Sequence, residues 1–183
     1  MEVNEVDRDS NKKPRINLLI PILLVITAAA LCITIWAVFF RDNEPVLAPD
    51  YAPQEEEKNA EAIPGDSDEK LDNPEGGSSV SLTYSRDVEI SLSERKASLL
   101  FANPGKSNQD MVLQIVIQGE VVVQSGTLKP GNQVKTLDLM DGVEEKLTAG
   151  TYEGNFAVLY YDPETGEKAI VNTEIPVTIT VSS

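Results

Sequence analysis

One stretch of 25 residues without a charged side chain, Ile16 to Phe40, constrains this chain more than any other feature. The hydrocarbon core of a bilayer is about 30 Å thick, and an α-helix rises about 1.5 Å per residue. A helix over residues 16–40 is therefore long enough to cross the core with some tilt. We expect a single transmembrane anchor helix over residues 16–40, with membrane lipid as its partner.

Two other interpretations of this stretch stay open. A cleaved secretory signal usually has only about 7–15 apolar residues before a site of small residues. Cleavage within 28–30, the run of three alanines, would leave a strongly apolar new N-terminus. A lipoprotein signal would attach lipid to Cys32, but bulky Leu31 stands where such signals carry a small residue. These features favour an uncleaved anchor in which Cys32 is inert.

Positive residues set the expected orientation of the anchor. Four of them precede it, namely Arg8, Lys12, Lys13 and Arg15. Within the same reach after it, only Arg41 and Lys58 are positive. Cytoplasmic flanks carry the excess of Lys and Arg. We therefore expect residues 1–15 in the cytoplasm and the C-terminal domain on the extracellular side of the cell membrane.

Residues 41–79 have no apolar pattern and are acidic. Residues 41–78 carry three bases and twelve acids, and five prolines interrupt the stretch. Such a segment buries too little apolar surface to offset the entropy of ordering. We expect 41–79 to be a disordered, proline-rich acidic linker that spaces a domain from the bilayer.

From residue 80 onward, apolar residues alternate with polar ones, which is typical of half-buried strands. Val88, Ile90 and Leu92 alternate in this way, and similar runs recur to the end of the chain. The pattern predicts seven to nine strands and no long helix, with one helical turn at 143–147. Turns are expected at Gly119-Glu120, at Pro130-Gly131 and over 162–166, with a bend or bulge at Pro176.

These spacings predict that residues 80–183 form an all-β, Ig-like Greek-key β-sandwich. The segment from Leu147 to Tyr152 resembles the tyrosine corner of such sandwiches, in which a Tyr hydroxyl bonds back across the preceding turn. The immunoglobulin Cys…Trp…Cys set is absent, because the only Trp is Trp36. The term Ig-like therefore refers to architecture.

The turn-rich segments of this domain carry a family resemblance. They are Asn103-Pro104, Val121 to Lys129 with Ser125-Gly126, Pro130-Gly131, and Leu147 to Tyr152. Over residues 80–183 the chain is similar to Ig-like modules on uncharacterised single-pass surface proteins of Gram-positive bacteria. The resemblance implies a surface location and a sandwich fold, and it implies no catalytic residue.

Missing residue types exclude several chemistries. The chain has no histidine, and its single cysteine, Cys32, lies in the predicted anchor. Ser-His-Asp and Cys-His catalysis and His-ligated zinc are excluded, as are thiolate catalysis and Cys-ligated metal in the outer domain. A net charge of −15 disfavours nucleic acid as a partner. We therefore expect no catalytic, cofactor-binding or metal-binding residues.

Three segments superficially suggest a site. Asn103 to Ser107 ends in Gly-Lys-Ser but lacks the first glycine of a phosphate loop, which favours a polar turn. One carboxylate set, Asp162, Glu164 and Glu167, favours a hairpin turn over a calcium site. The other set, Asp138, Asp141, Glu144 and Glu145, favours a solvated connection, and neither set indicates the cleft of a glycosidase.

Two function classes remain, with an enzyme as a distant third. The first is a non-catalytic extracellular module for protein binding or surface assembly, with an unidentified extracellular protein or cell-wall partner. The alternative is an accessory subunit of a membrane transport, secretion or cell-wall complex, in which the anchor helix itself makes specific contacts. Recognition would use sheet edges, loops or apolar residues off the core face, with Leu100, Val116, Val122, Leu159 and Tyr161 as candidates.

Overall fold

The computed structural model describes residues 21–23, 25–31, 49–67, 69–75 and 77–183. The chain divides into two compact units, Met1–Pro45 and Val46–Ser183. In the first unit, residues 21–23 and 25–31 are helical. Within the described residues, no helix combines the length and the apolar character needed to cross a membrane. Most of the predicted span, 16–40, lies outside the described residues.

The second unit is built mainly from β-strands, which confirms the prediction of a mostly β domain after residue 80. Its elements are β1 (Glu61–Ala62), β2 (Thr83–Tyr84), β3 (Asp87–Ser91), β4 (Lys96–Asn103), β5 (Asp110–Ile117), β6 (Glu120–Gln124), β7 (Asn132–Asp138), α2 (Val143–Lys146), β8 (Gly150–Tyr161) and β9 (Thr173–Ser182). The expected helical turn near residue 143 is present as α2.

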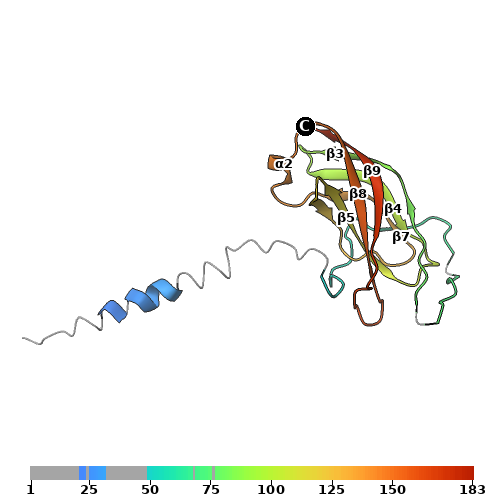
Figure 1. Cartoon of the computed structure of the whole chain (residues 1–183), viewed down its shortest axis with the longest axis horizontal. Helices are drawn as coiled ribbons and strands as arrows, with labels where there is room; N and C mark the ends of the chain where they lie inside the picture. Colours follow the sequence, from blue (N-terminus) through green and yellow to red (C-terminus); the bar gives the residue numbers. More distant parts are fainter. Residues whose placement is uncertain (1–20, 24, 32–48, 68, 76) are drawn as a thin grey trace, which may run out of the picture. The chain divides into compact units, whose positions relative to one another are not determined.

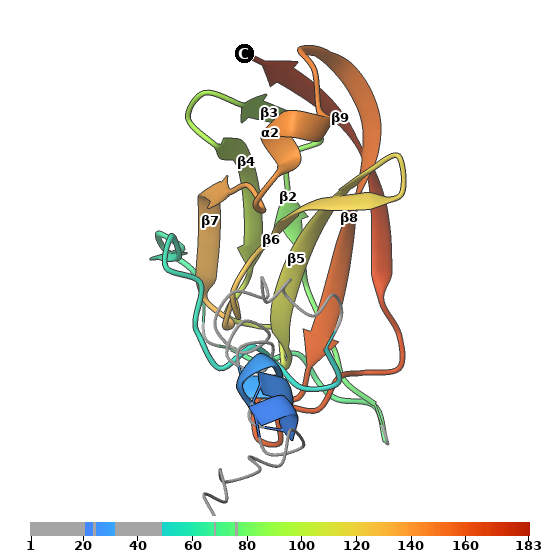
Figure 2. The same cartoon turned by 90° about the vertical axis from the view of Figure 1, so that its left-hand side faces the viewer.

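The strands form one curled sheet in the order β1-β7-β4-β3-β9-β8-β5-β6, with β2 beside β4 (Figure 1). Every pairing is antiparallel except that of β3 with β9, which places Val88 beside Ile179 in parallel. Because β3 pairs with both β4 and β9, it joins the two halves of the sheet. Figure 2 shows β4 and β7 on one side of the domain and β8 and β9 on the other.

The core lies between these two halves. Phe101 of β4 meets Phe156 of β8 edge to face, with ring centroids 6.1 Å apart. Along β9 the buried positions Ile175, Val177 and Ile179 alternate with more exposed ones, as the sequence pattern predicts. The burial of about two dozen such side chains is the main stabilising contribution, since each apolar side chain contributes roughly 1.5–3 kcal/mol.

Two positions in the long β8–β9 hairpin have specific backbone roles. Gly154 lies so close to β5 that an added Cβ would stand 2.6 Å from Val116 O. Pro176 pairs with Asn155 without any shift of register, so the expected bend or bulge is absent. A proline is tolerated there because β3 pairs with β9 only from Thr178 onward, which leaves the far side of Pro176 without a strand partner.

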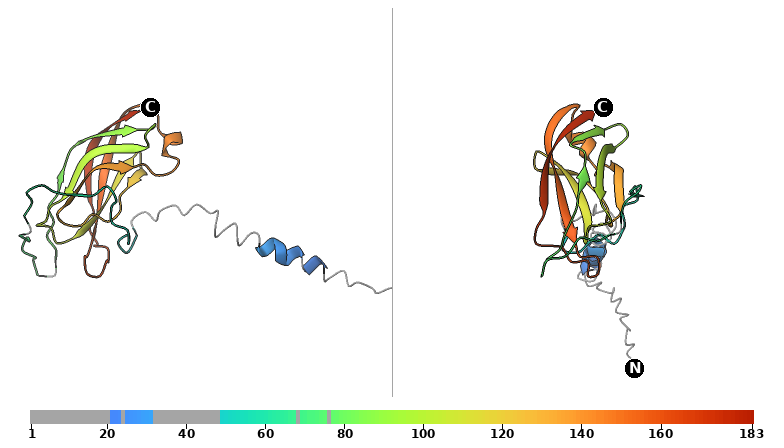
Figure 3. Two further views of the ribbon diagram at one scale, coloured as in Figure 1. Left: turned by 180° about the vertical axis from the view of Figure 1, so that it is seen from behind. Right: turned by 90° about the vertical axis from the view of Figure 1, so that its right-hand side faces the viewer.

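The described part of residues 41–79 is ordered on the β domain, contrary to the prediction of a disordered linker. We call residues 49–79 the strap, meaning 49–67, 69–75 and 77–79 as described. At its start, Tyr51 forms a β-bridge with Glu167, and Ala52 N donates to Gly166 O at 2.8 Å. Further along, β1 pairs with the outer side of β7, with Glu61 beside Gln133. Figure 3 shows the strap crossing the domain.

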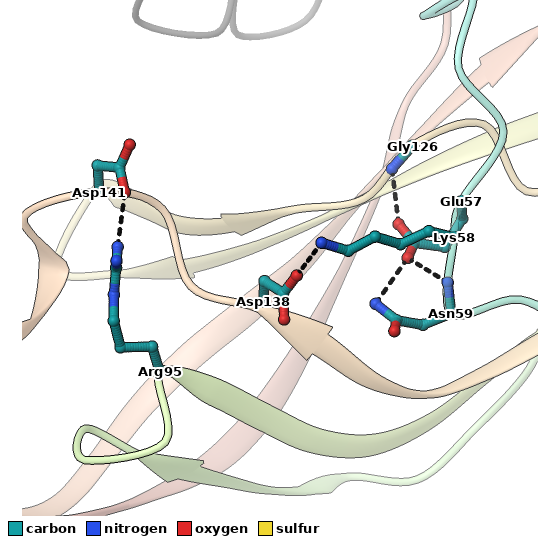
Figure 4. Close-up of polar contacts among 7 residues, drawn as sticks. All are labelled: Glu57, Lys58, Asn59, Arg95, Gly126, Asp138 and Asp141. Carbon is teal, nitrogen blue, oxygen red and sulfur yellow. Dashed lines mark hydrogen bonds and ion pairs between the residues drawn. The ribbon is translucent and has the colours of Figure 1, made fainter.

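Hydrogen bonds join the strap to the domain, among them Glu57 N to Thr127 O at 3.0 Å and Ile63 N to Gly131 O at 2.9 Å. Glu57 is 8% exposed, and its carboxylate accepts hydrogen bonds from Asn59 N, Asn59 Nδ2 and Gly126 N (Figure 4). Lys58 forms an ion pair with Asp138 of β7. These bonds satisfy polar groups that are buried or lie at the sheet edge. Their contribution offsets the conformational entropy that the strap loses when it becomes ordered.

The strap also covers part of the outer face of β5 and of the end of β8. Val112, Leu159 and Tyr161 form a small cluster on the outer side of this half of the sheet, against which Ala52 packs. Tyr161 Oη donates to Pro49 O at 3.0 Å. Burial raises the pKa of Tyr161 to about 12, with a further contribution from the nearby charge of Asp50.

Candidate functional site

A depression with an apolar floor lies beside α2. It has a volume of about 270 Å³ and lies between the end of β5, the start of β6 and the short helix. Its lining residues are Ile117, Gln118, Glu120, Val122, Val143, Lys146 and Leu147. We call this depression the α2 groove. A concave site with an apolar floor and a few polar groups is the usual form of a binding site.

Two turns create the α2 groove. The β5–β6 hairpin reverses at Gln118 and Gly119, whose φ values are 53° and 85°. Such a turn needs positive φ at both positions, which Gly119 adopts without steric cost. The turn falls one residue earlier than the expected Gly119-Glu120. On the other side, α2 begins after Gly142, which has a φ of 76°.

A tyrosine corner fixes the far end of α2, as the sequence predicts. Tyr152 Oη donates to Thr148 O at 2.9 Å, across the turn between α2 and β8. On the near side, Met140 N donates to Val122 O at 3.0 Å, which ties the segment before α2 to β6. Together the two bonds hold α2 over the open end of the core.

The floor of the α2 groove is apolar and its rim is charged. Ile117, Val122 and Val143 are each less than 5% exposed, and half-buried Leu147 borders them. At the rim, Lys146 Nζ lies 3.1 Å from Glu120 Oε2, and both side chains are more than half exposed. An exposed pair of this kind contributes little to folding stability, so a ligand group can displace it at small cost. The groove therefore suits an apolar side chain flanked by polar or charged groups.

A second cavity, of about 340 Å³, is lined by charged and amide side chains and by two prolines. Its lining residues are Lys70, Asn108, Asp110, Lys129, Pro130 and Pro163. Both ammonium groups have protein partners, because Lys70 donates to Ser107 O and Lys129 pairs with Glu56. Burial raises the pKa of Asp110, and the charge of Lys129 opposes that shift. Its charged groups are already paired, and its apolar lining comes from two prolines and side-chain stems with no large buried apolar side chain, which makes it the weaker candidate.

Four of the seven carboxylates that the sequence singled out, Asp138, Asp141, Glu144 and Asp162, bond to other groups of the domain. Asp162 Oδ1 accepts hydrogen bonds from the N–H groups of Glu164 and Thr165, which lower the pKa of Asp162 and close the hairpin turn. This confirms the turn interpretation of 162–166. In the other set, Asp141 Oδ1 lies 2.6 Å from Arg95 Nη2, as Figure 4 shows, and Glu144 forms an ion pair with the same arginine. Among the described residues, no group of three or more potential ligands could hold a metal ion.

The segment from Asn103 to Ser107 is a polar turn, as expected. Asn103 Nδ2 donates to Gln109 O and Leu128 O, and Ser107 N donates to Pro104 O at 2.9 Å. The buried Ser107 hydroxyl exchanges hydrogen bonds with the backbone of Ser81. The turn thus attaches the chain just after the strap to the domain.

The apolar residues proposed as contacts separate into two groups. Val122, Leu159 and Tyr161 are buried, while Leu100 and Val116 are half-buried. Of the five, only Val122 lines the α2 groove. Sequence reasoning missed Val143 and Leu147 as site residues. The available signal was the apolar i, i+4 pair that they form across one helical turn.

No protein-family model matches the chain, and no curated protein matches it. Among solved structures, it is similar to AggA, the major subunit of aggregative adherence fimbriae type I from Escherichia coli. That chain is 11% identical, with a TM-score of 0.29 and coverage of 62% of this chain and 99% of AggA. The CooA pilin subunit from enterotoxigenic Escherichia coli is 16% identical, with a TM-score of 0.23 and coverage of 57% of this chain and 99% of CooA. Scores this low support no argument about function.

Proposed function

We propose that the chain is a non-catalytic, membrane-anchored extracellular module that binds a protein partner or a cell-wall component through the α2 groove. The observation that carries this proposal is the groove itself. It is a depression of about 270 Å³ with an apolar floor and an exposed Glu120–Lys146 pair at its rim. An apolar anchor in a desolvated pocket surrounded by polar groups is the usual energetic centre of a protein interface.

The location of the α2 groove supports the same proposal. The strap joins the domain at the hairpin over 162–168, where Tyr51 forms a bridge with Glu167. Figures 1 and 2 show this hairpin at one end of the domain and α2 at the other. A domain tethered through residues 16–40 would therefore carry its groove at the end away from the tether.

An Ig-like Greek-key sandwich is the finer description of the fold that we propose. The tyrosine corner at Tyr152 supports it, and so does the parallel pairing of β3 with β9. A third feature is that consecutive strands pair differently, since β2 pairs with β4 whereas β3 also pairs with β9. The resemblance to Ig-like modules of Gram-positive surface proteins agrees with this description.

The proposed binding is tested by site-specific photo-crosslinking on cells that produce the full chain. A photoreactive residue in place of Gln118, at the groove, should capture a discrete partner. The same residue in place of Thr165, on the opposite hairpin, is the matched control and should capture none. Equal capture from both positions, or no capture from Gln118, would contradict the proposal.

The anchor helix needs its own test, because the alternative function places specific contacts there. Scrambling the order of residues 16–40 while keeping them apolar should leave capture from Gln118 unchanged. Loss of capture in the scrambled chain would favour an accessory subunit whose helix makes specific contacts within a membrane complex.

A further inference from the structure

Three large apolar side chains of the β domain are exposed at one end. Ile170 is fully exposed, while Val171 and Tyr51 are 69% and 60% exposed. In the described part of this domain, the only other large apolar residue in this class is Val80, at 38%. We call Tyr51, Ile170 and Val171 the hairpin patch. Tyr51 lies opposite Glu167 of the hairpin, three residues before Ile170. Large exposed apolar side chains on adjacent segments usually mark a contact surface.

The backbone presents these residues on a braced support. Gly166 N donates to Asp162 O at 2.8 Å, and Ala169 N donates to Tyr160 O at 2.8 Å, just before Ile170. The strap braces the same hairpin, since Lys168 N donates to Asp50 O at 2.9 Å. Because the backbone beside these residues is already held, a contact there costs little further backbone conformational entropy.

The route of the chain indicates what the hairpin patch meets. The strap begins at Pro49, whose carbonyl is bonded to Tyr161 beside this hairpin. Only eight residues, 41–48, separate it from the apolar stretch over 16–40. Fully extended, eight residues reach no more than about 29 Å. If 16–40 crosses a bilayer, the end of the domain that carries the hairpin patch stays within reach of the lipid surface.

Charge restricts the kind of lipid surface that fits. The segments around the hairpin patch carry five acids, Asp50, Asp162, Glu164, Glu167 and Glu174, and one base, Lys168. Anionic headgroups would repel these carboxylates, and salt would screen that repulsion. The surface therefore suits apolar insertion into an electrically neutral interface.

We propose that Tyr51, Ile170 and Val171 insert into the interfacial layer of the membrane that holds the chain, so that the domain rests on the bilayer with its α2 groove outward. This proposal rests on the proposed anchoring by residues 16–40. Tethering favours such an arrangement, because it raises the effective concentration of a weak insertion site at the surface.

The test uses the full chain in phosphatidylcholine vesicles whose acyl chains carry bromine, which quenches tryptophan fluorescence on contact. In a Trp36→Phe background, Ile170→Trp is the reporter, and Glu94→Trp, in the exposed turn between β3 and β4, is the control. We expect quenching of Ile170→Trp to exceed that of the control by at least about twofold, because interfacial apolar side chains lie at the headgroup and acyl boundary. Added phosphatidylglycerol should reduce the quenching at low salt, and added salt should restore it.

A second reporter separates insertion from mere proximity. Tyr51→Trp should be quenched in the same vesicles, and the double change Ile170→Ser with Val171→Ser should remove most of that quenching. Unchanged quenching in the double variant, or equal quenching of the Ile170→Trp and Glu94→Trp chains, would overturn the inference. A blue shift of Ile170→Trp with rising protein concentration in detergent would also overturn it, in favour of contact with a second copy.

Vesicle flotation distinguishes the two possible failures. A chain that floats with the vesicles but shows no preferential quenching retains its anchor and contradicts only the insertion of the hairpin patch. A chain that does not float with the vesicles contradicts the anchoring on which the proposed function depends.

Discussion

Individual polar residues explain how an acidic segment becomes part of the domain. Glu57 is the clearest case, because its carboxylate is buried and accepts three hydrogen bonds, one of them from Gly126 across the fold. Gly126 is also required at its position, since the Cβ of any other residue would lie 2.9 Å from Glu55 O of the strap. A buried acceptor with matched donors stabilises a segment that has few apolar residues.

Replacing Glu57 tests this role. Glu57→Ala removes three hydrogen bonds and leaves the half-buried Gly126 N–H without its acceptor, which should lower the free energy of unfolding by about 2 kcal/mol. The control Glu56→Ala breaks an exposed pair with Lys129 and should cost clearly less, because an exposed ion pair adds little stability. Urea unfolding measures both values. Equal losses in the two variants would show that Glu57 does not hold the strap.

Asp110 gives a prediction of pH dependence. Burial raises its pKa above the ordinary value of 3.8. The folded state therefore binds this proton more tightly than the unfolded state. The contribution of the protonated Asp110 to the free energy of unfolding is fully present below pH 3.8 and is lost as pH rises through the folded pKa. Asp110→Asn should raise the free energy of unfolding at neutral pH and have little effect near pH 3.

The control for this comparison is the exposed Asp87, whose replacement by Asn should change stability little at either pH. Chemical denaturation at the two pH values measures all three proteins. If Asp110→Asn were destabilising at neutral pH, the carboxylate would be making a favourable interaction that outweighs its burial.

At the scale of elements, α2 and the tyrosine corner shape one wall of the proposed binding groove. α2 has only four residues, too few to be stable alone, so its position depends on contacts at both ends. Those contacts are the Met140–Val122 bond before α2 and the Tyr152–Thr148 bond after it.

Removing the corner hydroxyl should loosen α2. Tyr152→Phe deletes the bond to Thr148 O and should cost about 1 kcal/mol of stability, while the amides of α2 exchange faster with solvent. Tyr51→Phe, on the exposed start of the strap, is the control and should change neither quantity. Hydrogen exchange monitored by mass spectrometry provides the readout. Unchanged exchange over 143–147 in Tyr152→Phe would contradict the proposed role of the corner.

Sequence reasoning predicted the strands but not the strap or the groove, and the reasons are physical. Alternation along β9 reflects a half-buried strand, so the pattern is visible in the residues themselves. The strap is held by backbone bonds and by Glu57, which leave no periodic pattern. The groove forms where Val122 of β6 meets Val143 of α2, and that meeting depends on the tertiary fold.

At the scale of the whole molecule, the strap makes the domain larger than its strand pattern indicates. It contacts the hairpin at one end of the domain, pairs with β7 along the side, and forms hydrogen bonds with Gly105 and Ser107 of the turn at 103–107. With the strap bound, only residues 41–48 remain between the ordered domain and the predicted anchor. A short connection of this kind favours a domain held close to the bilayer.

The central claim is that residues 16–40 hold the chain in a membrane and that the domain with its α2 groove faces outward. A membrane-impermeant maleimide tests it on intact cells that produce the full chain with Cys32→Ser and Gln118→Cys, so that the groove carries the only thiol. We predict labelling of intact cells to the same extent as after lysis, with the labelled chain in the membrane fraction. Labelling only after lysis, or release of the labelled chain into the medium, would contradict the account.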